Sequence, residues 1–264
     1  MTRSPKLDAC MPHAELPPDL LDCLRSASRV AVLTGAGVSA ESGIPTFRDA
    51  QTGLWAKHDP MQLASPEGFE ADPRLVWDWY QWRRKLIAES SPNAGHFALA
   101  EMARYFDGFV LVTQNVDGFH QLAGAEGVLE LHGNIQRSIC SKTRKLIEPD
   151  WLGRHADRRP PPSPHHEQGL ARPDVVWFGE ALDATTLDAA FSAAGDCDLM
   201  IVAGTAGAVQ PAASLPFVAR ESGARVLDVN PEATGISRIA DWHLAGPGAA
   251  WLPTLAQAVL DNRG

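Results

Sequence analysis

The fold class is decided by the stretch RVAVLTGAG, residues 29–37. Its first half is a short continuous apolar run, typical of a strand covered on both faces. Its second half places Gly35, Ala36 and Gly37 directly behind that strand, with a further small residue at Ala40. This pattern is typical of a turn where the backbone approaches a pyrophosphate at the start of a helix. A tight strand-to-helix turn that binds nothing would use the same glycines.

Further strands and helices alternate along the chain. Apolar runs occur at residues 109–113, 128–131, 175–178, 199–203 and 225–229, and helical patterns at 72–89, 93–106, 184–194, 211–222 and 249–261. Such alternation predicts an α/β fold with a doubly wound, mostly parallel, Rossmann-like sheet. We expect one domain over residues 17–262, with a large lobe built from 29–133 and 175–262.

The alternation breaks between Asn134 and Pro173. This stretch has little periodicity, six arginines and a proline-rich run at residues 159–166. We therefore predict a small inserted lobe over 134–174, with parts of 45–90 forming a helical lobe.

Composition excludes several classes of protein. The 264 residues are 45% hydrophobic and have a net charge of −9, and no apolar run has the length of a membrane-spanning helix. The negative charge also argues against a phosphate backbone as the main partner, so we expect neither nucleic acid nor membrane binding. Four unpaired cysteines and the lack of a signal peptide predict a cytoplasmic protein. The oligomeric state is not predicted.

Five ordered blocks are more specific than the glycines alone: GAGVSAESGIPTFRD (35–49), TQNVDGFHQLAG (113–124), LHG (131–133), RPDVVWFGE (172–180) and GTAGAVQPAA (204–213). Together they resemble the sirtuin family of NAD-dependent protein-lysine deacylases. The resemblance implies that NAD is a co-substrate, that acylated lysine side chains of proteins are the partners, and that the acyl group moves to ADP-ribose as nicotinamide leaves.

The same resemblance assigns roles to residues. His132 matches the base that takes a proton from a ribose hydroxyl, and Asn115 matches the other catalytic position. On their own, His132 would be interpreted as a core histidine and Asn115 as part of a turn. The cofactor-binding residues implied are Gly35, Ala36, Gly37, Ser39, Ile44, Phe47, Arg48, Gln114, Asn115, Asp117, Gly204, Thr205, Asn230, Glu232 and Gly248.

A Tyr-x-x-Arg pair indicates the acyl group. Tyr80 and Arg83 share one helix face, so a hydroxyl and a guanidinium can converge on one carboxylate. The pair resembles the signature of class III sirtuins, which remove succinyl, malonyl or glutaryl groups, and Ala64 matches their small residue. Alternatively, Leu75, Trp79, Trp82 and Leu86 form the core stripe, with Tyr80 and a solvated Arg83 beside it. The peptide is expected to add as a strand along Val175, Val176, Phe178 and Gly179.

The pattern departs from the family at the zinc site. Most sirtuins hold a structural zinc with two CxxC pairs, whereas here the first pair is reduced to Cys140 and the second falls near Pro164 and Glu167. We expect no structural zinc, because a tetrahedral site needs four good ligands. A substitute set from Cys140, His155, His165 and His166 is the alternative.

Two other functions use the same pocket. ADP-ribosyl transfer or NAD hydrolysis would redirect the activated sugar, and an NAD-binding module would have lost the chemistry. The presence of His132 favours deacylation over both.

Overall fold

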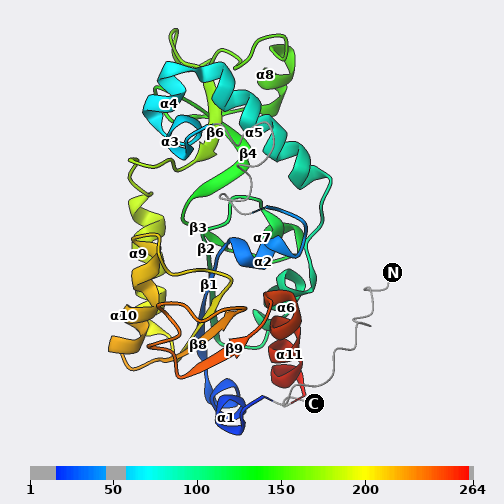
Figure 1. Ribbon diagram of the computed structural model, residues 1–264, viewed down its shortest axis with the longest axis vertical. Coiled ribbons are helices and arrows are strands. Elements are labelled where there is room, and N and C mark those ends of the chain that lie inside the picture. The colour runs from blue at the N-terminus through cyan, green and yellow to red at the C-terminus, as the bar shows by residue number, and fades with distance from the viewer. Residues whose placement is uncertain (1–15, 46–57, 262–264) are drawn as a thin grey trace.

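The computed structural model describes residues 16–45 and 58–261. Its centre is a six-stranded sheet in the order β3-β2-β1-β7-β8-β9 (Figure 1). Every pairing in this sheet is parallel, which confirms the predicted doubly wound α/β class. The strands are β1 (Arg29–Thr34), β2 (Gly108–Thr113), β3 (Leu129–Glu130), β7 (Leu199–Ala203), β8 (Arg225–Asn230) and β9 (Trp242–Ala245).

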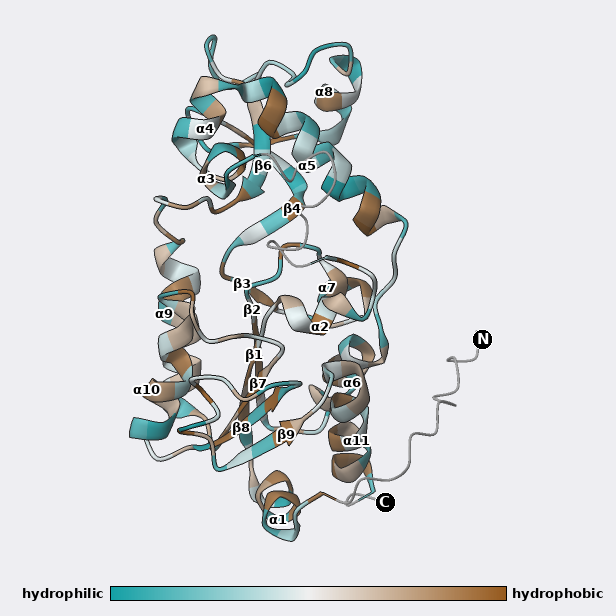
Figure 2. Ribbon diagram, viewed as in Figure 1, coloured by the Kyte–Doolittle hydropathy of each residue, from teal (hydrophilic) through white to brown (hydrophobic). Residues whose placement is uncertain are grey.

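Helices cover both faces of this sheet. One face carries α1 (Pro18–Ser26), α6 (Ala94–Met102) and α11 (Gly248–Leu260), and the other carries α9 (Ala184–Asp196) and α10 (Leu215–Glu221), which follows a 3₁₀ turn (Ala212–Ser214). The strands alternate between the two cores: Val30 and Val32 pack with the first layer, Ala31 and Leu33 with the second. Two buried faces explain why the strands are continuous apolar runs, visible as brown arrows in Figure 2.

A small lobe lies at the other end of the molecule (Figure 1). It contains an antiparallel sheet in the order β5-β4-β6, formed by β4 (Gly133–Cys140), β5 (Leu146–Ile147) and β6 (Ala171–Val175). Around it lie the helices α3 (Pro60–Leu63), α4 (Pro66–Ala71), α5 (Pro73–Ala88) and α8 (Pro149–Arg154). Helix α5 begins where Asp72 accepts a bond from the Leu75 N–H at 2.9 Å and Pro73 takes the first turn.

Two sequence expectations are wrong in this lobe. The run 175–178 was expected as a strand of the main sheet, but only Val175 lies in a strand, and that strand is antiparallel to β4. Residues 134–140, expected to be irregular, lie in β4. A register shift between Asn134 and Ser138 interrupts the alternation of inward and outward side chains, so the sequence pattern does not indicate a strand here.

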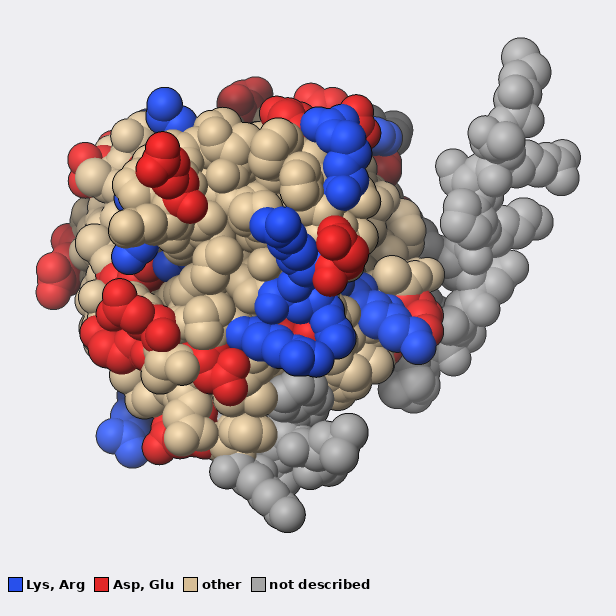
Figure 3. Space-filling view, turned by 90° about the horizontal axis from the view of Figure 1, so that it is seen from above, with Lys and Arg blue, Asp and Glu red and all other residues tan. Residues whose placement is uncertain are grey.

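The end of the molecule that carries the small lobe shows intermingled charges (Figure 3). Arg137 lies 2.8 Å from both Glu130 and Asp174, and Arg144 lies 3.1 Å from Glu180. Acidic side chains thus neutralise these arginines locally.

No helix among the described residues has the length and apolar character needed to cross a membrane.

Candidate active site

The carboxyl ends of the central parallel strands converge on one edge of the sheet, where open α/β sheets bind ligands. Gln114 and Asn115 follow β2, Gly35 follows β1, and Gly204 and Thr205 follow β7. The Asn115 amide donates to the Gly35 carbonyl at 3.1 Å, and the Gln114 amide donates to the Thr205 hydroxyl at 2.9 Å. The structure therefore brings together residues that are distant in the sequence.

Glycines allow the ends of β1 and β7 to interlock. A Cβ on Gly35 would lie 2.6 Å from the Thr205 Cβ, and one on Gly37 would lie 2.8 Å from the Gly204 Cα. Gly204 also has a φ of +63°, in the left-handed region. The close approach explains these glycines as packing, because the Gly35 N–H donates to the Ala203 carbonyl at 3.0 Å and the Gly37 N–H donates to the Gly204 carbonyl at 2.8 Å. The exposed Ala36 then opens the short helix α2 (Ala36–Ala40). The glycines and the exposed helix start both fit a phosphate-binding turn.

A buried polar network lies beneath Asn115. The Ser39 hydroxyl donates to Asp117 at 2.8 Å and accepts from the Asn115 amide at 3.1 Å. Burial raises the pKa of Asp117, and bonds from the Phe119 N–H and Ser39 oppose that rise. Three predicted site residues are thus linked through one hydroxyl.

Two histidines that sequence reasoning missed support this network. His96 Nδ1 accepts from the Asn93 N–H at 3.2 Å, so the proton is on Nε2, which faces Ser39 at 3.3 Å. His120 Nε2 lies 2.9 Å from the Thr34 hydroxyl. Burial lowers the pKa of His96 to about 4 and that of His120 to about 3, so both are neutral at pH 7. The Asn-x-x-His pattern at the start of α6, where both side chains cap the helix, was the available signal for His96.

His132 has the geometry of a general base. Its Nδ1 lies 3.0 Å from the Gln114 carbonyl, which only accepts, so Nδ1 carries the proton and Nε2 has the free lone pair. Burial lowers the pKa of His132, and the bond to the carbonyl partly opposes this. The ring is therefore fixed in one tautomer and is unprotonated at neutral pH.

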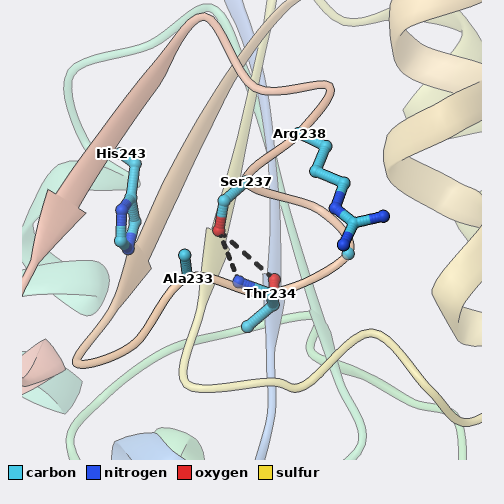
Figure 4. Close-up of a pocket in the computed structure, with 6 residues that line it drawn as sticks. Ala233, Thr234, Ser237, Arg238 and His243 are labelled. Atoms are coloured by element: carbon cyan, nitrogen blue, oxygen red, sulfur yellow. Dashed lines mark hydrogen bonds between the residues drawn. The ribbon is translucent and has the colours of Figure 1, made fainter.

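Asn230 and Glu232, two further predicted cofactor residues, lie across the sheet from His132. Asn230 is buried at the end of β8 and donates to Asp228, whereas Glu232 is exposed. A pocket adjoins them in the β8–β9 loop (Figure 4), and His243 Nε2 lies 3.1 Å from the Asn230 carbonyl oxygen. The pocket is lined by Ala233, Thr234, Gly235, Ser237, Arg238 and His243.

Five predicted cofactor residues remain, of which the structure describes three. Ala36 opens α2 and Ile44 is buried. Gly248 begins α11, where a Cβ would meet Val38 at 3.5 Å. Phe47 and Arg48 lie outside the described residues.

Tyr80 belongs to the core of the small lobe. Its side chain is buried, and its hydroxyl accepts a bond from the Trp177 indole at 2.9 Å. The alternative that placed Tyr80 beside the core is therefore wrong. Ala64, also buried, belongs to the same cluster.

Arg83 makes no ion pair with any of the described residues. Its guanidinium lies 5.1 Å from the centre of the Trp79 ring and 5.8 Å from that of Tyr80. Within residues 16–45 and 58–261, no carboxylate is at ion-pair distance from it. Burial lowers the pKa of Arg83, while Tyr80 and Asp117 oppose the shift. An anionic group would relieve this desolvated charge.

The segment after β6 connects His132 to Ala64, a residue predicted to line the acyl-binding part of the site. The Val176 N–H donates to the His132 carbonyl at 3.0 Å, and the Phe178 N–H donates to the Ala64 carbonyl at 2.9 Å. Phe178 is exposed and Gly179 has a φ of +86°. One short piece of chain therefore sets the relative positions of His132 and Ala64.

The four residues of the alternative zinc set are not grouped around one point in the small lobe. Cys140 is buried, His155 Nδ1 bonds to the Trp151 carbonyl at 2.9 Å, and His165 Nε2 bonds to the Leu146 carbonyl at 2.7 Å. His166 Nδ1 accepts from the Gln168 N–H at 3.1 Å. In the part of the chain that the structure describes, no three His, Cys, Asp or Glu side chains are grouped to hold a metal.

Comparison with known proteins agrees with this geometry. Residues 35–211 match the model of the Sir2 family. The chain belongs to the Sir2 family. This sirtuin is 50% identical to an NAD-dependent protein deacylase of Aquifex aeolicus over 81% of its own length and 88% of the relative. It is 45% identical to one of Methylococcus capsulatus over 94% of its length and 99% of the relative.

A solved Sir2 homologue in complex with NAD has a similar structure. It is 38% identical, the TM-score is 0.86, and the match covers 94% of this sirtuin and 95% of that chain. The relatives therefore show the family that the quoted blocks resemble, and the structure brings residues of those blocks to one edge of the sheet.

Proposed function

We propose that this sirtuin is an NAD-dependent protein-lysine deacylase that prefers acidic acyl groups, with succinyl- and malonyl-lysine as leading substrates and acetyl-lysine as a weaker one. The catalytic assignment rests on His132, whose Nδ1 is fixed by the Gln114 carbonyl and whose Nε2 has no hydrogen-bond partner among the described residues. The relatives' names support the deacylase class.

The donor set at the sheet edge suits NAD. When bound, NAD supplies an electrophilic ribose carbon as its nicotinamide leaves. Asp117, Ser39 and Asn115 offer buried polar groups. The glycine turn at residues 35–37 leads directly into helix α2, and a helix start after such a turn suits a phosphate group. His132 Nε2 would accept a proton from a ribose hydroxyl of the bound dinucleotide, which is the general-base role that its fixed tautomer allows.

The acyl preference rests on one observation: Arg83, with a largely desolvated guanidinium, has no acidic partner among the described residues. Tyr80 adds a hydroxyl donor beside it, since its oxygen already accepts from Trp177. A planar guanidinium fork with a hydroxyl suits a terminal carboxylate. An acetyl group carries no such anion and leaves both donors unused.

Residues 175–179 offer a bound peptide fewer backbone N–H groups than pairing along the whole run would require. The N–H groups of Val176, Trp177 and Phe178 donate to His132, Glu180 and Ala64 respectively. We propose that the peptide pairs with carbonyl groups of this segment and with Gly179. Recognition through the backbone predicts loose sequence selectivity.

One experiment separates deacylation from its alternatives. The enzyme is incubated with NAD and two peptides of identical sequence, one with succinyl-lysine and one with acetyl-lysine, and the products are identified by mass spectrometry. We expect O-succinyl-ADP-ribose, formed faster than O-acetyl-ADP-ribose. ADP-ribosylated protein or free ADP-ribose alone would indicate the transferase or hydrolase, and no product would indicate a binding module. Equal rates for both peptides would refute the acyl preference.

A further inference from the structure

Trp177 lies in the acyl end of the site but was not among the expected substrate residues. The chain alternates here: the Phe178 side chain is 47% exposed, whereas that of Trp177 is 3% exposed. The indole packs 5.3 Å from the ring centre of Phe69 and 6.3 Å from that of Tyr80. Trp177 therefore faces Tyr80 rather than the peptide.

The hydrogen bond between these residues has a fixed direction. An indole N–H can only donate, so the Tyr80 oxygen is the acceptor of the 2.9 Å bond. A phenol has one proton, and within the described residues that proton has no acceptor. The acceptor side of the hydroxyl is filled, and its donor side is free.

We infer that Trp177 is a positioning residue for acyl selectivity: its indole N–H occupies the acceptor side of the Tyr80 hydroxyl and directs the hydroxyl proton to the carboxylate of an acidic acyl group. The inference rests on the proposed preference for acidic acyl groups. Trp177 itself need not touch the carboxylate.

An ion-paired turn holds the indole in place. The Glu180 carboxylate accepts from the Trp177 backbone N–H at 2.9 Å, and the Arg172 guanidinium donates to the same carboxylate at 2.7 and 2.9 Å. Arg172 also donates to the Val175 carbonyl at 2.8 Å. Gly179, with its φ of +86°, allows the chain to turn between Trp177 and Glu180.

The Arg172 guanidinium also lies on the indole face. Its central carbon is 3.3 Å from the ring centre of Trp177, and its side chain is only 5% exposed. A cation over the ring is attracted to its π electrons, which restrains the indole plane. Backbone and ring of Trp177 are thus both fixed by the Arg172–Glu180 pair, so the N–H is aimed before substrate arrives.

The test replaces Trp177 by Phe, which keeps an aromatic ring and removes the N–H. Trp151→Phe is the matched control, because the Trp151 indole also donates one bond, to the Pro162 carbonyl at 2.8 Å, at a small-lobe site that takes no part in the proposed clamp. For each variant, kcat and KM are measured with succinyl- and acetyl-lysine peptides of one sequence. We expect Trp177→Phe to lower the succinyl-to-acetyl ratio of kcat/KM about tenfold, through KM for the succinyl peptide, and Trp151→Phe to leave the ratio unchanged.

A double-mutant cycle with Tyr80→Phe excludes a merely structural role. Without the Tyr80 hydroxyl, Trp177→Phe should change the ratio less than about twofold, since the two changes remove one interaction. The inference is overturned if Trp177→Phe alone leaves the succinyl-to-acetyl ratio of kcat/KM unchanged, or if it lowers that ratio just as much in the Tyr80→Phe background.

The two proposals fail in different ways. If the native enzyme prefers succinyl-lysine but Trp177→Phe keeps that preference, only the role of Trp177 is wrong. If the native enzyme shows no preference, the acyl proposal is wrong and the selectivity role falls with it. The Trp177–Tyr80 bond is then judged separately by the indole ¹H–¹⁵N resonances: the peak missing in Trp177→Phe should shift in Tyr80→Phe, and an unmoved peak contradicts the bond itself.

Discussion

Replacing Arg83 by Met removes one positive charge from the acyl end and keeps much of the side chain's length. The guanidinium stacks near Trp79 and Tyr80 at 5.1 and 5.8 Å from their ring centres, contacts that a flexible thioether can partly reproduce. No ion pair within the described residues is lost. The substitution therefore tests the anion-binding role with little disturbance of packing.

The expected effect follows from the bonds that a guanidinium fork makes to a carboxylate. Two charge-assisted hydrogen bonds contribute about 1.5 kcal/mol each at the lower end of their range, so about 3 kcal/mol is lost, or about 150-fold in kcat/KM for a succinyl-lysine peptide. The acetyl peptide offers no carboxylate and loses far less. Because burial lowers the pKa of Arg83, its charged form is held against a desolvation cost, and the variant should unfold at the same or a higher temperature.

The assay compares initial rates of the two peptides at saturating NAD, with nicotinamide release as the readout. Lys85→Met is the matched control, since it removes a positive charge from the same helix at a position where the side chain is 74% exposed. We expect the succinyl-to-acetyl ratio to collapse in Arg83→Met and to persist in Lys85→Met. An equal loss with both peptides, or an unchanged ratio, would refute the clamp.

Three further outcomes follow from the site. Burial lowers the pKa of His132, so the acidic limb of the kcat–pH profile should lie below the ordinary histidine value of about 6.5, and a midpoint above 7 argues against this base. Gly35→Ala should raise KM for NAD and destabilise the fold by about 1–3 kcal/mol, because the new Cβ would lie 2.6 Å from the Thr205 Cβ. Gly153→Ala is the control, since a Cβ at that position would lie in open space. His120 has a folded-state pKa of about 3, so its contribution to the free energy of unfolding is complete above pH 6.5 and declines by about 1.4 kcal/mol per pH unit as the pH falls toward 3. In urea unfolding, the stability of His120→Gln should therefore fall less steeply with decreasing pH than that of the native protein.

The large sheet was predictable because its strands obey a simple physical rule. Strands buried on both faces must be apolar throughout, and β7 was expected at the residues where it occurs. The small lobe was expected, but its strands were not, because the bulge in β4 disrupts alternation and because residues 176–178 are held by single bonds to His132 and Ala64 rather than by a ladder. Strand β9, only four residues long, was also missed.

The candidate site was predictable where family motifs carry it and not where tertiary contacts do. His132 and Asn115 stand in quoted blocks, and the structure brings them to the same edge of the sheet. Trp177 is in the same block as Phe178, yet its role depends on facing Tyr80, which is 97 positions away in the sequence. His96 likewise contacts Ser39 from a separate helix, and no local sequence pattern indicates that these two side chains are close.

The segment between β6 and Glu180 joins two functions in one length of backbone. Neighbouring N–H groups tie it to the carbonyls of His132 and Ala64, so any shift that widens the acyl end also moves the chain behind the proton acceptor. Under the proposed function, the range of acyl groups accepted and kcat therefore depend on the same segment. Substitutions that admit a bulkier acyl chain should lower kcat even for the original substrate. We therefore expect a sirtuin of this type to gain new acyl substrates in small steps, each accompanied by a compensating substitution near His132.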